Sequence, residues 1–196
     1  MKHIGEILET NERGQLLRMA LSASDCLTVV EIGTLDGTGS TKIIIEALLQ
    51  KNSLDLHFIT IEANYDAYNL AKFNLRDAPP FVTVLYGNLM TPDSPLLVNG
   101  LTPTESEWLT SDLSQRFKSP NVIDQLPAKI DLLVLDGGEF TSYADYLSLR
   151  DRSRAIYLDD CLVRKNRLTL KMAVEEGFKL ERMTTDGNGA AYLRRN

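Results

Sequence analysis

Short apolar runs alternate with amphipathic stretches along most of the chain. Five of the runs are nearly continuous in apolar residues, as expected for strands covered on both faces of a parallel sheet. They span 27–32, 56–61, 82–86, 130–135 and 155–158. Helical spacing of apolar residues follows at about 40–48, 65–75, 142–151 and 168–176. This alternation predicts an α/β fold with a parallel sheet.

The C-terminal part of the chain has a different pattern. Two further candidate strands, 178–183 and 190–194, flank the turn Asp186-Gly187-Asn188-Gly189. Asp-Gly and Asn-Gly pairs favour hairpin turns because both tolerate positive φ. We therefore expect a terminal hairpin that adds one antiparallel strand to a mostly parallel sheet.

The length of 196 residues predicts one domain over 1–196. Residues 1–26 carry helical spacing, interrupted near Asn11, and predict one or two short helices before the first strand. Residues 89–129 form an insertion longer than a plain crossover needs. Within it, Thr102-Pro103-Thr104-Glu105 predicts the start of a helix. The insertion is either a crossover helix with a long surface lead-in or a lid over the substrate.

Composition narrows the classes of partner. The net charge of −6 and the lack of a Lys/Arg run disfavour nucleic acid, so a small-molecule partner fits better. Neither a signal peptide nor a membrane span is expected, which predicts a cytoplasmic protein without membrane contact. Cys26 and Cys161 are interpreted as small buried hydrophobic residues. The sequence does not determine the oligomeric state, and a homodimer is one of the possibilities.

A glycine-rich turn follows the first expected strand. Residues 28–41 are typical of a buried strand, a turn and a helix start capped by Ser40 or Thr41, an arrangement that presents backbone N–H groups to a nucleotide. A P-loop needs Lys after its last glycine, but Ser40 follows Gly39. A dinucleotide-binding motif needs a third glycine where Lys42 stands. The pattern that remains is Glu31-x-Gly33-x-x-x-Gly37-x-Gly39.

This turn resembles the first motif of the class I S-adenosylmethionine-dependent methyltransferases, in particular the small-molecule O-methyltransferases. The similar residues are Glu31-Ile32-Gly33-Thr34, with Gly37 and Ser40. Glu62 is similar to the family's acidic residue that binds both ribose hydroxyls, a task that suits a carboxylate. Gly87-Asn88 stands where the family commonly has Gly-Asp beside the adenine.

The resemblance spans about 27–195 and implies a Rossmann-like, doubly wound, mostly parallel seven-stranded sheet with a C-terminal antiparallel hairpin. It also implies S-adenosyl-L-methionine (SAM) as the cofactor. The cofactor-binding residues that it implies are Glu31, Gly33, Thr34, Gly37, Ser40, Glu62, Ala63, Gly87, Asn88 and Asp136.

Three aspartates follow the fourth and fifth expected strands. Asp136, Asp159 and Asp160 would meet at the edge where open α/β sheets bind ligands, and their charges repel unless a cation lies between them. Mg²⁺ prefers such oxygen ligands. The pattern resembles the metal-dependent O-methyltransferases, of catechol type or acting on natural-product sugars, which implies that the three aspartates bind the ion. Alternatively, Asp136 contacts the cofactor or caps a helix, and the other two cap a helix without an ion.

By the same resemblance the expected catalytic residues are Glu139, as general base, and Asp136. Lys165 and Asn166 either donate hydrogen bonds to substrate or belong to an exposed loop. The prediction is a SAM-dependent methyltransferase (EC 2.1.1) that methylates a hydroxyl of a sugar, polyol or natural product with the help of a divalent metal. The alternatives are a metal-free N- or C-methyltransferase and an inactive methyltransferase-like binding or scaffold protein.

Overall fold

A computed structural model describes residues 7–195, so the expected helical pattern at residues 1–6 lies outside the described residues. Within that range seven strands form one sheet in the order β3-β2-β1-β4-β5-β7-β6. β1 to β5 are parallel, and β7 runs antiparallel to both of its neighbours. The predicted fold class is confirmed. The strands are β1 (Thr28–Ile32), β2 (His57–Glu62), β3 (Val82–Tyr86), β4 (Leu132–Leu135), β5 (Ala155–Asp159), β6 (Lys179–Thr184) and β7 (Ala190–Arg194).

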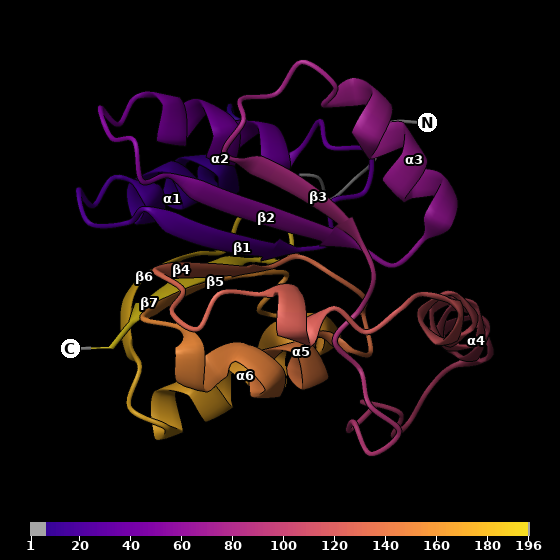
Figure 1. Cartoon of the computed structure of the whole chain (residues 1–196). Helices are drawn as coiled ribbons and strands as arrows, with labels where there is room; N and C mark the ends of the chain where they lie inside the picture. The colour runs from indigo at the N-terminus through magenta and orange to yellow at the C-terminus, as the bar shows by residue number, and fades with distance from the viewer. Residues whose placement is uncertain (1–6, 196) are drawn as a thin grey trace.

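Helices cover both faces of the sheet, and a further helix lies beyond one edge of the layers (Figure 1). They are α1 (Glu12–Leu21), α2 (Ser40–Leu49), α3 (Tyr65–Asn74), α4 (Pro103–Lys118), α5 (Ser142–Leu149) and α6 (Arg164–Glu175). The first three lie on one face, α5 and α6 lie on the other, and α4 stands apart (Figure 1). Of the described residues, none belongs to a helix with the length and hydropathy that crossing a membrane requires.

The core consists of two apolar clusters, one on each face of the sheet. Neighbouring residues of β1 contribute to opposite clusters, Val29 to one and Val30 to the other, because successive side chains of a strand point to opposite faces. The same division holds for Leu132 and Leu133 in β4. Burial on both faces is the physical reason for the continuous apolar runs in the sequence. Both cysteines are buried as predicted.

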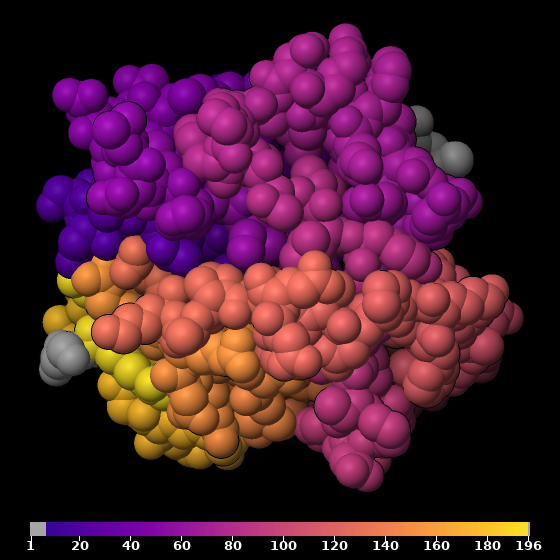
Figure 2. All heavy atoms as spheres, in the orientation of Figure 1, coloured from indigo at the N-terminus to yellow at the C-terminus, as the bar shows by residue number. Residues whose placement is uncertain are grey.

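The register of the sheet brings the carboxyl ends of its central strands to one edge. Ile32 pairs with Leu135, and Leu135 pairs with Leu158, so the turns that follow β1, β4 and β5 lie side by side. In the space-filling view the stretch between α4 and β4 crosses the visible face of the molecule, between the α3 side and the α5–α6 side (Figure 2). The residues predicted to bind ligands are therefore gathered at one edge of the sheet.

Helix boundaries agree with the sequence at α4 and differ at α2. The capping box predicted at Thr102 is confirmed, since its hydroxyl accepts a hydrogen bond from Glu105 N–H and the Glu105 carboxylate accepts one from Thr102 N–H. The prediction that Ser40 or Thr41 caps α2 is wrong. Gly39 is the N-cap and makes no side-chain capping bond, because both hydroxyls donate instead to the buried carboxylate of Glu31.

Candidate active site

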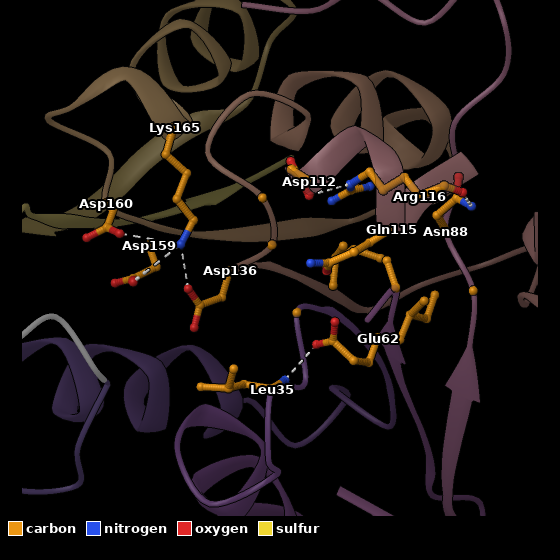
Figure 3. A pocket seen from close by; sticks show the side chains of 17 residues that line it. Leu35, Glu62, Asn88, Asp112, Gln115, Arg116, Asp136, Asp159, Asp160 and Lys165 are labelled. Atoms are coloured by element: carbon orange, nitrogen blue, oxygen red, sulfur yellow. Dashed lines mark hydrogen bonds and ion pairs between the residues drawn. The ribbon is translucent and has the colours of Figure 1, made fainter. Parts of the chain in front are cut away.

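A cavity of about 410 Å³ lies at the carboxyl ends of the central strands (Figure 3). Turns after β1, β2, β3, β4 and β5 line it, together with residues of α4 and α6. The predicted cofactor or metal residues that line it are Gly33, Glu62, Ala63, Gly87, Asn88, Asp136, Asp159 and Asp160. The other predicted residues are not part of this lining: Glu31, Thr34, Gly37, Ser40 and Glu139.

Gly33 lets two backbone turns approach each other closely. Its φ of +99° is in the left-handed region, and a Cβ at this position would lie 2.5 Å from the carbonyl oxygen of Asp136. The turn after β1 therefore packs directly against the turn after β4. Leu35, two residues on, also has a positive φ, 51°, which is uncommon for a residue with a side chain. Its N–H donates a 2.8 Å hydrogen bond to Oε2 of Glu62.

Glu31 supports the turn from behind. Its side chain is fully buried, and its carboxylate accepts hydrogen bonds of 2.6 to 2.7 Å from the hydroxyls of Ser40, Thr41 and Thr60. Thr34 joins the same network through a hydroxyl contact of 2.5 Å with Thr60. Burial raises the pKa of Glu31 to about 7, although the three hydroxyls favour its charged form. The network fixes the start of α2 against β1 and β2, and so shapes the turn.

Glu62 ends β2 and presents a fixed carboxylate to the cavity. Its Oε2 accepts from Leu35 N–H and its Oε1 from Asn64 N–H, both at 2.8 Å. Each carboxylate oxygen has two lone pairs, so both oxygens keep the capacity to accept a further hydrogen bond from a ligand. Burial raises the pKa of Glu62. A ligand that presents two hydrogen-bond donors, such as two adjacent hydroxyl groups, suits this carboxylate.

Gly87 and Asn88 hold the end of α4 beside β3. The Asn88 side-chain amide donates to the carbonyl oxygens of Arg116 and Ser119, each at 2.9 Å, and its oxygen accepts from Met90 N–H at 2.8 Å. A Cβ on Gly87 would lie 2.8 Å from the carbonyl oxygen of residue 120. The Asn88 side chain is therefore engaged within the protein.

Helix α4 provides a wall of the cavity through residues that the sequence analysis did not single out. Asp112, Gln115 and Arg116, from its last turns, line the cavity. Arg116 pairs with Asp112 at 3.3 Å and with the fully buried Asp145 at 3.4 Å. Burial lowers the pKa of Arg116, but the two carboxylates raise it more, so the guanidinium stays charged. The insertion of residues 89–129 thus contributes directly to the cavity.

The three aspartates meet as the sequence predicted, but two basic side chains, Lys165 and Arg13, pair with them. Figure 3 shows the three aspartates around Lys165. Lys165 Nζ lies 2.6 Å from Asp136 Oδ1, 3.4 Å from Asp160 Oδ2 and 3.9 Å from Asp159 Oδ2. Arg13 Nη1, from α1, lies 3.1 Å from Asp159 Oδ1 and 3.4 Å from Asp160 Oδ1. The cation expected between the carboxylates is therefore present as part of the chain.

These residues do not fit the predicted Mg²⁺. A magnesium ion needs oxygen ligands at about 2.0–2.1 Å in near-octahedral geometry. The Lys165 ammonium group occupies the space among the aspartate carboxylates, close to an oxygen of each. Within residues 7–195 no group of three or more His, Cys, Asp or Glu side chains is arranged to hold a metal ion.

Lys165 and Asn166 are functional candidates whose place the sequence did not fix. The exposed-loop alternative is wrong, because both are buried on the first turn of α6, which starts at Arg164 and not near residue 168. Asn166 donates to the carbonyl oxygens of Leu135 at 3.1 Å and Asp159 at 2.6 Å, the last residues of β4 and β5. The available signal was their position in the sequence, five and six residues after Asp160.

Glu139 lies on the turn between β4 and α5, directly after the cavity-lining Gly138. It is half-buried, and burial raises its pKa while the nearby Lys165 lowers it. A raised pKa suits a general base that works near neutral pH. Its role as the base stays a prediction.

Solved structures with the same architecture hold SAM or its product S-adenosylhomocysteine (SAH). An O-methyltransferase from Bacillus cereus in complex with SAH is 16% identical, with a TM-score of 0.62 over 95% of this chain and 82% of that one. The O-methyltransferase TomG of Streptomyces achromogenes, involved in tomaymycin synthesis and bound to SAM, is 16% identical, with a TM-score of 0.61 over 94% and 80%. The SAH-bound methyltransferase PaMTH1 of Podospora anserina is 12% identical, with a TM-score of 0.61 over 94% and 78%.

Comparisons of sequence gave no such relatives. No model of a known protein family matches the chain, and no curated protein matches it. The structural likenesses, at identities below 20%, establish architecture. The chain shares the overall fold of these solved methyltransferase structures. Its own sheet has seven strands and ends in an antiparallel hairpin.

Proposed function

We propose that the protein is a SAM-dependent methyltransferase that transfers a methyl group to a hydroxyl oxygen of a small molecule. The observation that supports this most is the carboxylate of Glu62. It is fixed by two backbone N–H groups and lines the same cavity as the Gly33 turn. The cavity, at about 410 Å³, falls in the range of small-molecule sites.

The residues present fit the cofactor. Glu62 would accept hydrogen bonds from the two ribose hydroxyls, and the turn at Gly33 would lie against the amino-acid part of SAM. Gly87, with the wall formed by α4, would border the adenine. When bound, SAM supplies an electrophilic methyl group carried by a sulfonium.

The carboxylate and ammonium groups after β4 and β5 would form the acceptor end of the site. Methyl transfer to a hydroxyl oxygen would release the hydroxyl proton, so the site needs a group that accepts it. Glu139 is our candidate for the base that takes it, since burial raises its pKa.

Calorimetric titration of the full chain with SAH and SAM tests the proposal. We expect saturable binding at one site per chain. Glu62→Gln should weaken SAH binding about 10- to 100-fold, because one acceptor oxygen becomes a donor and a charge-assisted hydrogen bond is lost. Glu107→Gln, at an exposed position of α4, is the matched control and should bind as the wild type does.

Lack of saturable binding by the folded wild type would overturn the proposal. If SAH binds but isotopically labelled SAM transfers no methyl group to any hydroxyl compound tested, the scaffold alternative is favoured. A labelled product whose new bond is to nitrogen or carbon would favour the other alternative.

A further inference from the structure

Lys165 and Arg13 supply the positive charge that the acceptor end of the cavity needs. Three carboxylates from two neighbouring strand ends carry three negative charges when ionised. The two side chains together bring two positive charges, which equals the charge of one divalent cation. Both approach the cluster closely, Lys165 from α6 and Arg13 from α1. The electrostatic demand for a cation is thereby met by the protein itself.

The position of Lys165 is fixed by its surroundings. Its side chain is 7% exposed, and it lies on a helix turn that Asn166 ties to the ends of β4 and β5. The ammonium group is held by ion pairs with all three aspartates. A buried charge of this kind persists only where it is paired.

Asp160 adds a second sign that the cluster is built around these cations. Its φ is 52°, in the left-handed region that residues with side chains seldom adopt. Its two carboxylate oxygens face different partners, Oδ1 towards Arg13 and Oδ2 towards Lys165, each at 3.4 Å. The backbone conformation thus accompanies a bridging ion pair.

We propose that Lys165 takes the place of a divalent cation in this site, so that the protein binds no metal between its three aspartates. The consequence for the reaction rests on the proposed function. An ammonium group donates hydrogen bonds but offers no open coordination positions, so it cannot chelate two acceptor oxygens as Mg²⁺ can. Methyl transfer then needs no metal, and the acceptor needs no second oxygen next to the reacting hydroxyl.

Binding of Mn²⁺ alone, followed by electron paramagnetic resonance on the full chain, tests the substitution of Lys165 for a metal. We expect no saturable Mn²⁺ site in the wild type up to about 1 mM, the weak end of protein cation sites. Lys165→Ala removes the ammonium group and leaves the three carboxylates, so this variant should gain one Mn²⁺ site. That site should bind Mn²⁺ at least about tenfold more tightly than the 1 mM limit set for the wild type. Lys171→Ala, at an exposed lysine of the same helix, should behave as the wild type.

Two results would overturn the proposal: a saturable Mn²⁺ site in the wild type that Asp160→Asn abolishes, or no more Mn²⁺ binding by folded Lys165→Ala than by Lys171→Ala. If Lys165→Ala folds only when Mn²⁺ is present, the proposal is supported. If Lys165→Ala does not fold at all, the same measurement is made on Lys165→Met, which retains an apolar stem of similar length. If neither variant folds, Mn²⁺ binding by the wild type alone decides the proposal. Titration with SAH tests the proposed function, and Mn²⁺ binding tests the role of Lys165. The two measurements are independent, so the Mn²⁺ result can be interpreted even if SAH does not bind.

Discussion

Replacing Gly33 with alanine tests whether the close approach of two turns shapes the cavity. The added Cβ would lie 2.5 Å from the carbonyl oxygen of Asp136, 2.7 Å from its carbonyl carbon and 2.9 Å from Cα of Gly137. All three are backbone atoms, so no flexible side chain can move aside. Either the turn after β1 or the turn after β4 must shift.

Two terms set the size of the effect. Holding alanine at a φ of +99° costs about 1–2 kcal/mol. Overpacking against fixed atoms costs a further ~1–3 kcal/mol. We therefore expect the free energy of unfolding to fall by about 2–5 kcal/mol. For a chain of 196 residues this corresponds to a Tm lower by about 4–20 °C.

Gly177→Ala is the matched control for Gly33→Ala. Gly177 follows α6 with a φ of +91°, but nothing lies within 4 Å of a Cβ placed there. Its substitution should carry only the conformational term of about 1–2 kcal/mol. Urea unfolding followed by circular dichroism measures both variants, and SAH titration reports the cavity. Equal stability losses in the two variants would show that the turns are not in rigid contact, and the account of how the cavity is shaped would then fail.

Two further predictions concern carboxyl groups with raised pKa values. Glu139→Gln should lower kcat about 10²- to 10⁴-fold and leave SAH affinity unchanged. In the wild type, the acidic limb of the pH–rate profile should lie above the ordinary glutamate range, because burial raises the pKa of Glu139. A variant with the same pH–rate profile as the wild type would exclude Glu139 as the base. Burial raises the pKa of Glu31 from 4.5 to about 7. Between these two pH values the folded state keeps a proton that the unfolded state releases. The free energy of unfolding should therefore fall by up to about 3 kcal/mol as pH rises from 4.5 to 7. Urea unfolding of Glu31→Gln across this range should lack that fall, and an identical pH dependence in wild type and variant would contradict the assignment.

The strands and the ligand-binding edge could be predicted because both follow from local pattern. Burial on both faces makes the parallel strands continuous in apolar residues, which the sequence displays directly. Residues just after neighbouring parallel strands must share an edge, so the meeting of Asp136 with Asp159 and Asp160 followed from their positions. The capping box at Thr102 is equally local and was predicted correctly.

The start of α6 could not be predicted from its own residues. Its N-cap is Val163, which has no side chain able to cap, so the usual sequence signal is missing. The first turn is held instead by Asn166, through backbone carbonyls of β4 and β5. At α2 the capping signal is present but misleading. Ser40 and Thr41 are good capping residues, but their hydroxyls donate to the buried carboxylate of Glu31 instead. In both places a tertiary contact outweighs the local preference.

The same limit explains why the sequence suggested a metal. Acidic residues at strand ends reveal the negative half of an electrostatic cluster, and the need for a cation follows from repulsion alone. The identity of that cation does not follow, because a divalent ion and two basic side chains carry the same positive charge and compensate the carboxylates equally. Here the positive half comes from Lys165 on the next helix and from Arg13, 146 residues away from Asp159 in sequence. In this chain, a lysine on the first turn of the helix after β5 therefore supplies the positive charge that the acidic strand ends alone would assign to a metal.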